Sequence, residues 1–222
     1  MWKKLLSVFK GTDLRQAAFN EALLMLQASH GMHRDAVAAL HKPGVLLTDI
    51  YERDRQINRF ERDVRRKILT HLSVSEKPDI NMSLIITAIV IDIERIGALT
   101  KNIAELAATS PDAFDGGELN GEIVELEEVV DGMFVDIGPA LGGDRGDLAR
   151  KIIRNHQELA DRVKQGLLLL QSGEALGGQA GRAVTAALYM RYLKRVSAHL
   201  KNVATSIVNP YDRIGFKEEK DE

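Results

Sequence analysis

The chain has 222 residues, of which 45% are hydrophobic and 5% aromatic, so it can bury a packed core. Its 30 basic and 32 acidic residues leave a net charge of -2, which excludes the strongly positive surface of a typical nucleic-acid-binding protein. The absence of cysteine excludes disulfides, thiolate metal sites and cysteine nucleophiles. Few prolines and many helix-forming residues indicate an all-α protein.

Residues 1–11 form a basic and apolar segment, MWKKLLSVFKG. Its apolar part ends too early for a secretion signal, and the longest apolar run, 84–91, is far shorter than the ~20 residues needed to cross a bilayer. We therefore expect a cytoplasmic protein. Two interpretations of residues 1–10 stay open: they pack on the helices, or they contact a membrane surface through Trp2 and Phe9.

Residues 12–112 are predicted to form a first unit of three long helices. Thr12 or Asp13 is the expected N-cap of the first helix, and Asp79 that of the third. The helices are separated by Lys42-Pro43-Gly44 and by residues 75–81, and Pro111 follows the third. Apolar residues recur at helical spacing in the second helix (Ile57, Phe60, Val64, Ile68) and in the third (Met82, Ile85, Ile89, Ile93, Ile96, Ile103).

Residues 118–210 repeat this pattern at an offset of one hundred. The segment 94–105 aligns with 194–205, and Gly142-Gly143, residues 175–181 and Pro210 fall opposite the breaks of the first unit. Gly173 is the expected C-terminal stop of the second helix. Apolar stripes recur in that helix (Leu159, Val163, Leu167, Leu170) and in the last one (Leu193, Val196, Leu200, Val203, Ile207).

The sequence therefore predicts an all-α fold of two tandem antiparallel three-helix bundles, packed side by side and joined near Gly116-Gly117. Residues 211–222 form a charged tail, in which we expect 217–222 to be disordered. Monomer and homodimer both remain open.

The segment 91–97, IDIERIG, followed by Asn102-Ile103-Ala104-Glu105, resembles the signature of the PhoU family, and residues 192–204 resemble a weaker copy of it. The resemblance implies two three-helix repeats and a non-enzymatic regulator of phosphate transport that contacts a membrane transporter or a sensor kinase. On this interpretation the candidate partner-binding residues are Glu94, Arg95, Asn102, Arg195 and Asn202, together with Trp2 and Phe9.

Some members of the family hold iron or zinc between carboxylates four residues apart on one helix face. Here Glu94 is followed by Ala98, and the second copy has Lys194 and Ala198. An alanine supplies no ligand and an ammonium repels a cation, so we expect no metal or other cofactor. Partial pairs remain at Asp54 with Asn58 and at Asn155 with Glu158. Were iron or zinc to bind, Asp54, Asn58 and Glu94 would be the candidate ligands.

Other polar residues have structural interpretations. We expect His30 and His33 to form a surface pair, Glu94 to pair with Arg62, Arg65 or Arg66, and Asn102 and Asn202 to be buried amides that bridge helices within each bundle. The arginines between 53 and 66 alternate with acids, which favours a salt-bridged exposed face over a docking face for an acidic partner. The chain lacks a Gly-x-Ser-x-Gly elbow and a phosphate-binding Gly-x-x-x-x-Gly-Lys loop.

The sequence leaves three possible functions to be compared. The first is a regulator or accessory protein of phosphate transport that acts by contact. The second is a helical carboxylate metal-binding protein, and the third is a structural partner of another membrane complex. We expect no catalytic residues under any of them.

Overall fold

The computed structural model describes residues 13–42, 47–109 and 112–218. These residues form six long helices and no strand: α2 (Leu14–Leu40), α3 (Ile50–Val74), α4 (Ile80–Thr109), α5 (Asn120–Gly142), α6 (Gly146–Ser172) and α7 (Ala180–Val208). Two short 3-10 helices, η1 (Gly117–Leu119) and η2 (Tyr211–Arg213), precede α5 and follow α7. The predicted all-α fold is confirmed. None of these helices is both long and apolar enough to span a bilayer.

Local signals in the sequence set several helix ends. The Asp13 carboxylate accepts a hydrogen bond from Gln16 N at 3.1 Å, and that of Asp79 accepts one from Met82 N at 3.0 Å. Each carboxylate satisfies a backbone N–H that has no partner within the helix. Gly173 ends α6 in the left-handed region at φ 78°, which glycine adopts without steric cost. The predicted caps at Asp13 and Asp79 and the predicted stop at Gly173 are therefore confirmed.

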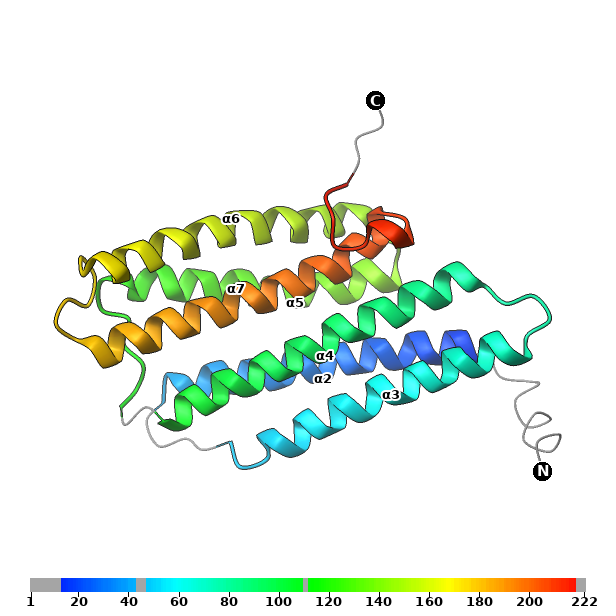
Figure 1. The fold of residues 1–222 in the computed structure, drawn as a ribbon, viewed down its shortest axis with the longest axis horizontal. Coiled ribbons are helices and arrows are strands. Elements are labelled where there is room, and N and C mark those ends of the chain that lie inside the picture. Colours follow the sequence, from blue (N-terminus) through cyan, green and yellow to red (C-terminus); the bar gives the residue numbers. More distant parts are fainter. Residues whose placement is uncertain (1–12, 43–46, 110–111, 219–222) are drawn as a thin grey trace.

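The six helices form two three-helix bundles, α2–α4 and α5–α7, which lie side by side (Figure 1). The bundles meet where α4 packs against α7 and where α2 packs against α5. The predicted architecture is confirmed, but the apolar stripe of α4 is shifted at its start. Met82 is exposed, whereas Ser83 and Ile86 are buried. Because α4 contacts α2, α3 and α7 at once, it buries a broader surface than one stripe supplies.

A small residue allows the second and third helices of each bundle to approach closely. A Cβ placed on Gly97 of α4 would lie 2.8 Å from Ile57 Cδ1 of α3. In the other bundle the corresponding residue is Ser197 of α7, whose hydroxyl contacts His156 of α6 at 2.9 Å. The buried residues Ile50, Ile57 and Val64 of α3 recur as the buried residues Ile152, Leu159 and Gly166 of α6, so α3 and α6 are related by an offset of 102 residues.

Residues 211–218 fold back on α6 and α7. The Asn209 amide donates hydrogen bonds to Arg213 O and Phe216 O, both at 3.0 Å, and Gly215 N donates to Thr205 Oγ1 at 2.7 Å. Glu218 pairs with Arg150 at 2.6 Å. The expected disorder is therefore wrong for Lys217 and Glu218, because helix residues supply partners for this segment. Residues 219–222 lie outside the described residues.

The close approach at Gly97 predicts that alanine substitutions at two glycines change the free energy of unfolding in opposite directions. Gly97→Ala should lower the free energy of unfolding by about 1 kcal/mol, because overpacking against Ile57 exceeds the gain in helix propensity. Gly132→Ala in α5 should raise it by up to about 1 kcal/mol, because no atom lies within 4 Å of the new methyl group. Urea denaturation measures both. Equal stabilisation by the two substitutions would contradict the packing at Gly97.

Candidate functional site

The helices that carry the two signature segments, α4 and α7, are joined by a polar contact. Asp92 Oδ1 of α4 accepts a hydrogen bond from Asn202 Nδ2 at 3.0 Å and lies 2.7 Å from His199 Nδ1. Asn202 therefore bridges the two bundles, and the prediction that it bridges helices within its own bundle is wrong. Asn102 is half-buried rather than buried, and Tyr192 stands at the position equivalent to Asp92.

Carboxylates gather between α3 and α4. Glu94 lies near Asp54 and Glu61, and burial, more than these two acids, raises the pKa of the Glu94 carboxyl, while Arg95 opposes the rise. Lys101 Nζ donates to Asp54 at 3.1 Å. The cluster thus holds three acids with one lysine and Arg95 at its edge.

The predicted partner of Glu94 is wrong. Glu94 pairs with the neighbouring Arg95, at 3.5 Å. Arg65 pairs instead with Glu61 at 2.8 Å, and Arg66 with Asp63 at 2.7 Å. Both acids belong to α3 itself, so these two arginines are neutralised along their own helix before they reach α4.

The residues present do not fit a metal of the family type. Lys101 neutralises Asp54, Asn58 donates its amide to Asp54 O at 2.9 Å, and Ala98 offers no ligand. Of the second partial pair, Glu158 is exposed on α6. In the described part of the chain, no group of three or more His, Asp and Glu side chains is arranged to hold a metal ion.

We predict that protein purified without a chelator contains less than one iron or zinc per chain, because Lys101 already pairs with Asp54 and Ala98 supplies no ligand. Elemental analysis measures this content. A reproducible content of one metal per chain that disappears in Glu94→Ala would show that the cluster binds metal despite Lys101.

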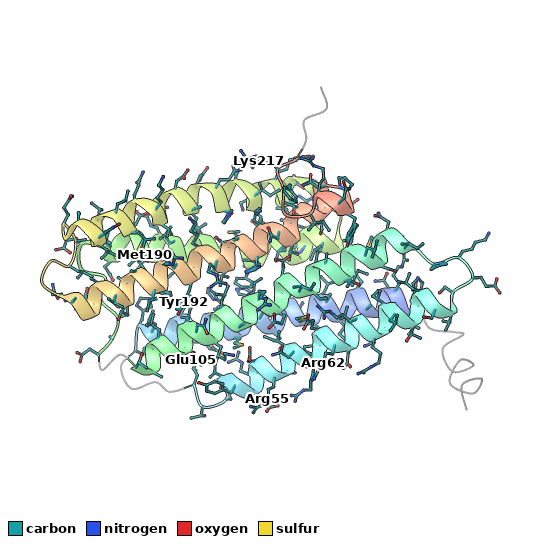
Figure 2. All side chains as sticks on the ribbon, in the orientation of Figure 1. Arg55, Arg62, Glu105, Met190, Tyr192 and Lys217 are labelled. Atoms are coloured by element: carbon teal, nitrogen blue, oxygen red, sulfur yellow. The ribbon has the colours of Figure 1, made fainter. Side chains whose placement is uncertain are left out.

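The arginines of α3 form ion pairs on the outer side of that helix, where Arg55 and Arg62 lie at the edge of the molecule (Figure 2). Arg55 and Arg59 both pair with Glu52, at 2.7 and 2.6 Å, and Arg53 pairs with Asp35 of α2 at 2.7 Å. The prediction of a salt-bridged exposed face is confirmed. Such exposed pairs contribute little to stability.

Histidines line the contact between α2 and α5, which the sequence did not indicate. His30 stacks on Phe134 with ring centroids 4.7 Å apart and lies 2.6 Å from Asp131 Oδ1. His33 is 2% exposed and also packs against Phe134. The prediction of a surface pair is wrong because α2 is covered by the second bundle. Only the distant Phe134 and Asp131 create this environment, so no local signal could have found it.

His41 takes part in the same contact at the C-terminal end of α2. Its Nε2 lies 2.8 Å from Glu127 Oε1 of α5, and the buried Tyr189 of α7 donates its hydroxyl to the same oxygen at 2.6 Å. The hydrogen bond to Glu127 raises the pKa of His41, and burial opposes the rise. In contrast, burial lowers the pKa of His33 to about 4, with a smaller effect of His30 in the same direction.

The contributions of His33 and His41 to stability change with pH in opposite directions. In the folded protein His33 stays neutral down to about pH 4, whereas in the unfolded chain it binds a proton below about pH 6.5. Its contribution to the free energy of unfolding is therefore lost as pH falls from 6.5 to 4. We predict that His33→Leu makes the acid-induced loss of stability smaller by about 3 kcal/mol over this range.

His41 serves as the matched control. Its raised folded pKa means that its contribution is fully present below about pH 6.5 and disappears as pH rises through the folded pKa. His41→Gln should therefore cost more stability at pH 6 than at pH 8. Urea denaturation at a series of pH values measures both variants, and a steeper acid loss in His33→Leu would refute the assignment.

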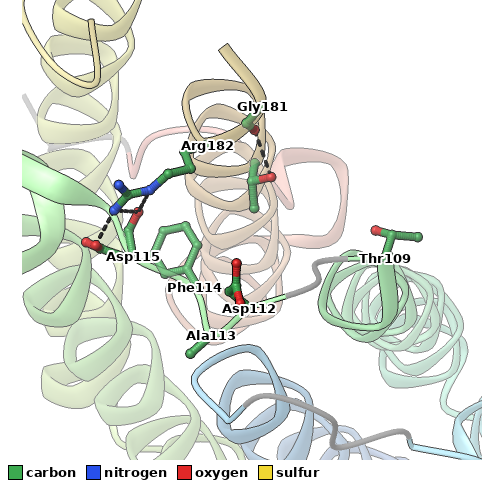
Figure 3. Close-up of a pocket in the computed structure, with 8 residues that line it drawn as sticks. Thr109, Asp112, Ala113, Phe114, Asp115, Gly181 and Arg182 are labelled. Carbon is green, nitrogen blue, oxygen red and sulfur yellow. Dashed lines mark hydrogen bonds and ion pairs between the residues drawn. The ribbon is translucent and has the colours of Figure 1, made fainter. Parts of the chain in front are cut away.

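A cavity of about 560 Å³ lies between the end of α4, the connection to η1 and the start of α7 (Figure 3). Arg182 pairs with Asp115 across it, and the Thr185 hydroxyl donates to Gly181 O at 3.0 Å. The Arg182–Asp115 pair thus ties the connection between the bundles to the start of α7.

The comparisons with known proteins bear on this architecture. The PhoU domain model matches residues 22–107, which include the signature segment at 91–105. The crystal structure of PhoU from Pseudomonas aeruginosa is similar with a TM-score of 0.80 and 22% identity, over 90% of this chain and 97% of that chain. The phosphate transport system regulatory protein PhoU from Streptococcus pneumoniae is similar with a TM-score of 0.70 and 15% identity, over 94% and 95%. No curated protein gave a match. The predicted resemblance is confirmed.

Proposed function

We propose that this chain, which carries a PhoU domain over residues 22–107, is a non-enzymatic regulator of phosphate transport. It acts on the cytoplasmic side of the membrane by contact with a transporter or a sensor kinase. The observation that carries the proposal is the match of the PhoU domain within a chain whose fold is that of two PhoU proteins over nearly its whole length.

The surface of α4 and α7 supports a contact mechanism. Leu84, Ile91 and Arg95 share one exposed stripe of α4, and Leu188, Arg191 and Arg195 share the equivalent stripe of α7. Because α4 and α7 pack against each other, the two stripes form parts of one face, called here the α4–α7 face. Exposed aliphatic side chains on a packed helix are the kind of surface that a partner covers.

The charge of the α4–α7 face indicates its partner. Arg191 and Arg195 form no ion pair with any residue in the described ranges, and Ala98 and Ala198 leave the same stripes without carboxylates. An acidic and apolar partner surface therefore fits it. Of the candidate binding residues, Arg95 and Arg195 are exposed on this face, Glu94 lies at its flank, and Trp2 and Phe9 lie outside the described residues.

A genetic test separates regulation by this face from other roles. Deletion of the gene should derepress phosphate-starvation genes in phosphate-rich medium, and the wild-type gene should restore repression. The double variant Ile91→Asp, Arg195→Glu should fail to restore it although it folds, because the substitutions change exposed positions. Leu69→Asp on the outer side of α3, where Leu69 is 67% exposed, is the matched control and should restore repression.

Purified transporter and kinase domains identify the partner directly. Pull-down with the transport ATPase subunit or the kinase cytoplasmic domain should retain the wild type and the Leu69→Asp control, and lose the double variant. Normal repression by the double variant would remove the α4–α7 face from the proposal. Unchanged expression of starvation genes in the deletion strain would remove regulation itself, and would favour a structural role in another membrane complex.

A further inference from the structure

The two bundles carry opposite charge at equivalent places between their second and third helices. In the first bundle Asp54, Glu61 and Lys101 all lie near Glu94, and Lys101 pairs with Asp54. The 102-residue offset of α6 places His156 and Val163 at the positions of Asp54 and Glu61, and the 100-residue offset of α7 gives Lys194 and Lys201 for Glu94 and Lys101. The group of three acids and one lysine in the first bundle thus corresponds to a group with two lysines and no acid in the second bundle.

Lys201 shows the consequence of this exchange. Its counterpart Lys101 is neutralised by Asp54 at 3.1 Å, but His156, at the position of Asp54, offers Lys201 no carboxylate. Lys201 Nζ instead donates to Gly215 O at 2.7 Å, and burial lowers the pKa of its ammonium, which Asp92 of α4 partly opposes. Asp92 itself is held by His199 and Asn202. Lys194 is half-buried and forms no ion pair with a described residue.

His156 lies between the two lysines. Ser197, which it contacts, is three residues after Lys194 and four before Lys201, so the lysines flank it by about one turn on each side. The Ser197 hydroxyl donates its hydrogen to Lys194 O at 2.8 Å, so His156 Nδ1 carries the proton that Ser197 Oγ accepts. Nε2 is then left as an acceptor. Burial and the lysines Lys201 and Lys194 lower the pKa of His156 to about 4.

Two positive charges beside one partly buried histidine are unfavourable unless an opposite charge joins them. The carboxylates of α6 do not supply it, because Glu158 and Asp161 are exposed and pair with neither lysine. We propose that Lys194, Lys201 and His156 form a binding site for a phosphate-class dianion between α6 and α7. The anion supplies the negative charge that Asp54 supplies in the first bundle, and His156 Nε2 takes up a proton to donate to it.

This site goes beyond the proposed function and stands without it, because the charge difference between the bundles carries it. Inorganic phosphate and a phosphoryl group on a partner side chain share this chemistry. Calorimetry of the full chain with inorganic phosphate at pH 7 should show saturable binding of one anion per chain with proton uptake. In NMR titrations phosphate should move the pKa of His156 upward from about 4. A phosphohistidine-analogue peptide forms the second arm, and tighter binding of the peptide than of phosphate would identify a protein-borne phosphoryl group.

Matched variants locate the site. Lys194→Glu, which restores the acid of the first bundle, should weaken phosphate binding by at least about tenfold, because it replaces a charge-assisted donor with a like charge. Lys101→Met, which removes the ammonium already neutralised by Asp54, should leave binding within about twofold. Unfolding midpoints verify that both variants fold.

Two results would overturn the site. The first is no saturable binding of either ligand up to about 10 mM, which is weaker than any physiological use of the site. The second is equal binding by wild type and Lys194→Glu, which would place the anion elsewhere. Normal repression by the double variant together with intact phosphate binding would contradict the α4–α7 face and leave this site standing, so the two proposals fail separately.

Discussion

α4 and α7 pack against each other while each also packs against both other helices of its own bundle. The rest of the structure depends on this double burial. Ile93 and Ile96 of α4 and Leu193 and Val196 of α7 are fully buried, so both helices contribute apolar side chains to the core. A polar group in the contact between them needs a partner, and Asp92 obtains one from each of His199 and Asn202. The same contact joins the two bundles into one body.

The fold could be predicted from the sequence because its signals are local. Asp13, Asp79 and Gly173 cap or stop helices through groups within three residues of themselves, and Ile57 and Val64 recur at helical spacing. The repeat then gave the number of helices and their order. The broader buried surface of α4 could not be predicted, since it depends on how many neighbours a helix receives rather than on its own periodicity.

The candidate sites were predicted less well because their environments come from distant residues. The acids Asp54 and Glu94 were recognised, but Lys101, which neutralises Asp54, was not. His33 looked like a surface residue because Phe134, which covers it, is 101 residues away. Offsets mattered in the same way: α6 follows α3 at 102 residues and α7 follows α4 at 100, and the shift by two residues decides which α6 side chain stands at the position of Asp54.

The position shared by Gly97 and Ser197 shows how duplicated bundles can diverge. Both residues are small, because the second and third helices approach closely there, but size is the only property that the packing demands. Glycine leaves the space to the apolar Ile57, whereas serine adds a hydroxyl that can hold an imidazole. A purely steric requirement thus leaves chemical identity free, and a buried polar group can enter one copy of a duplicated core while the other copy continues to maintain the fold.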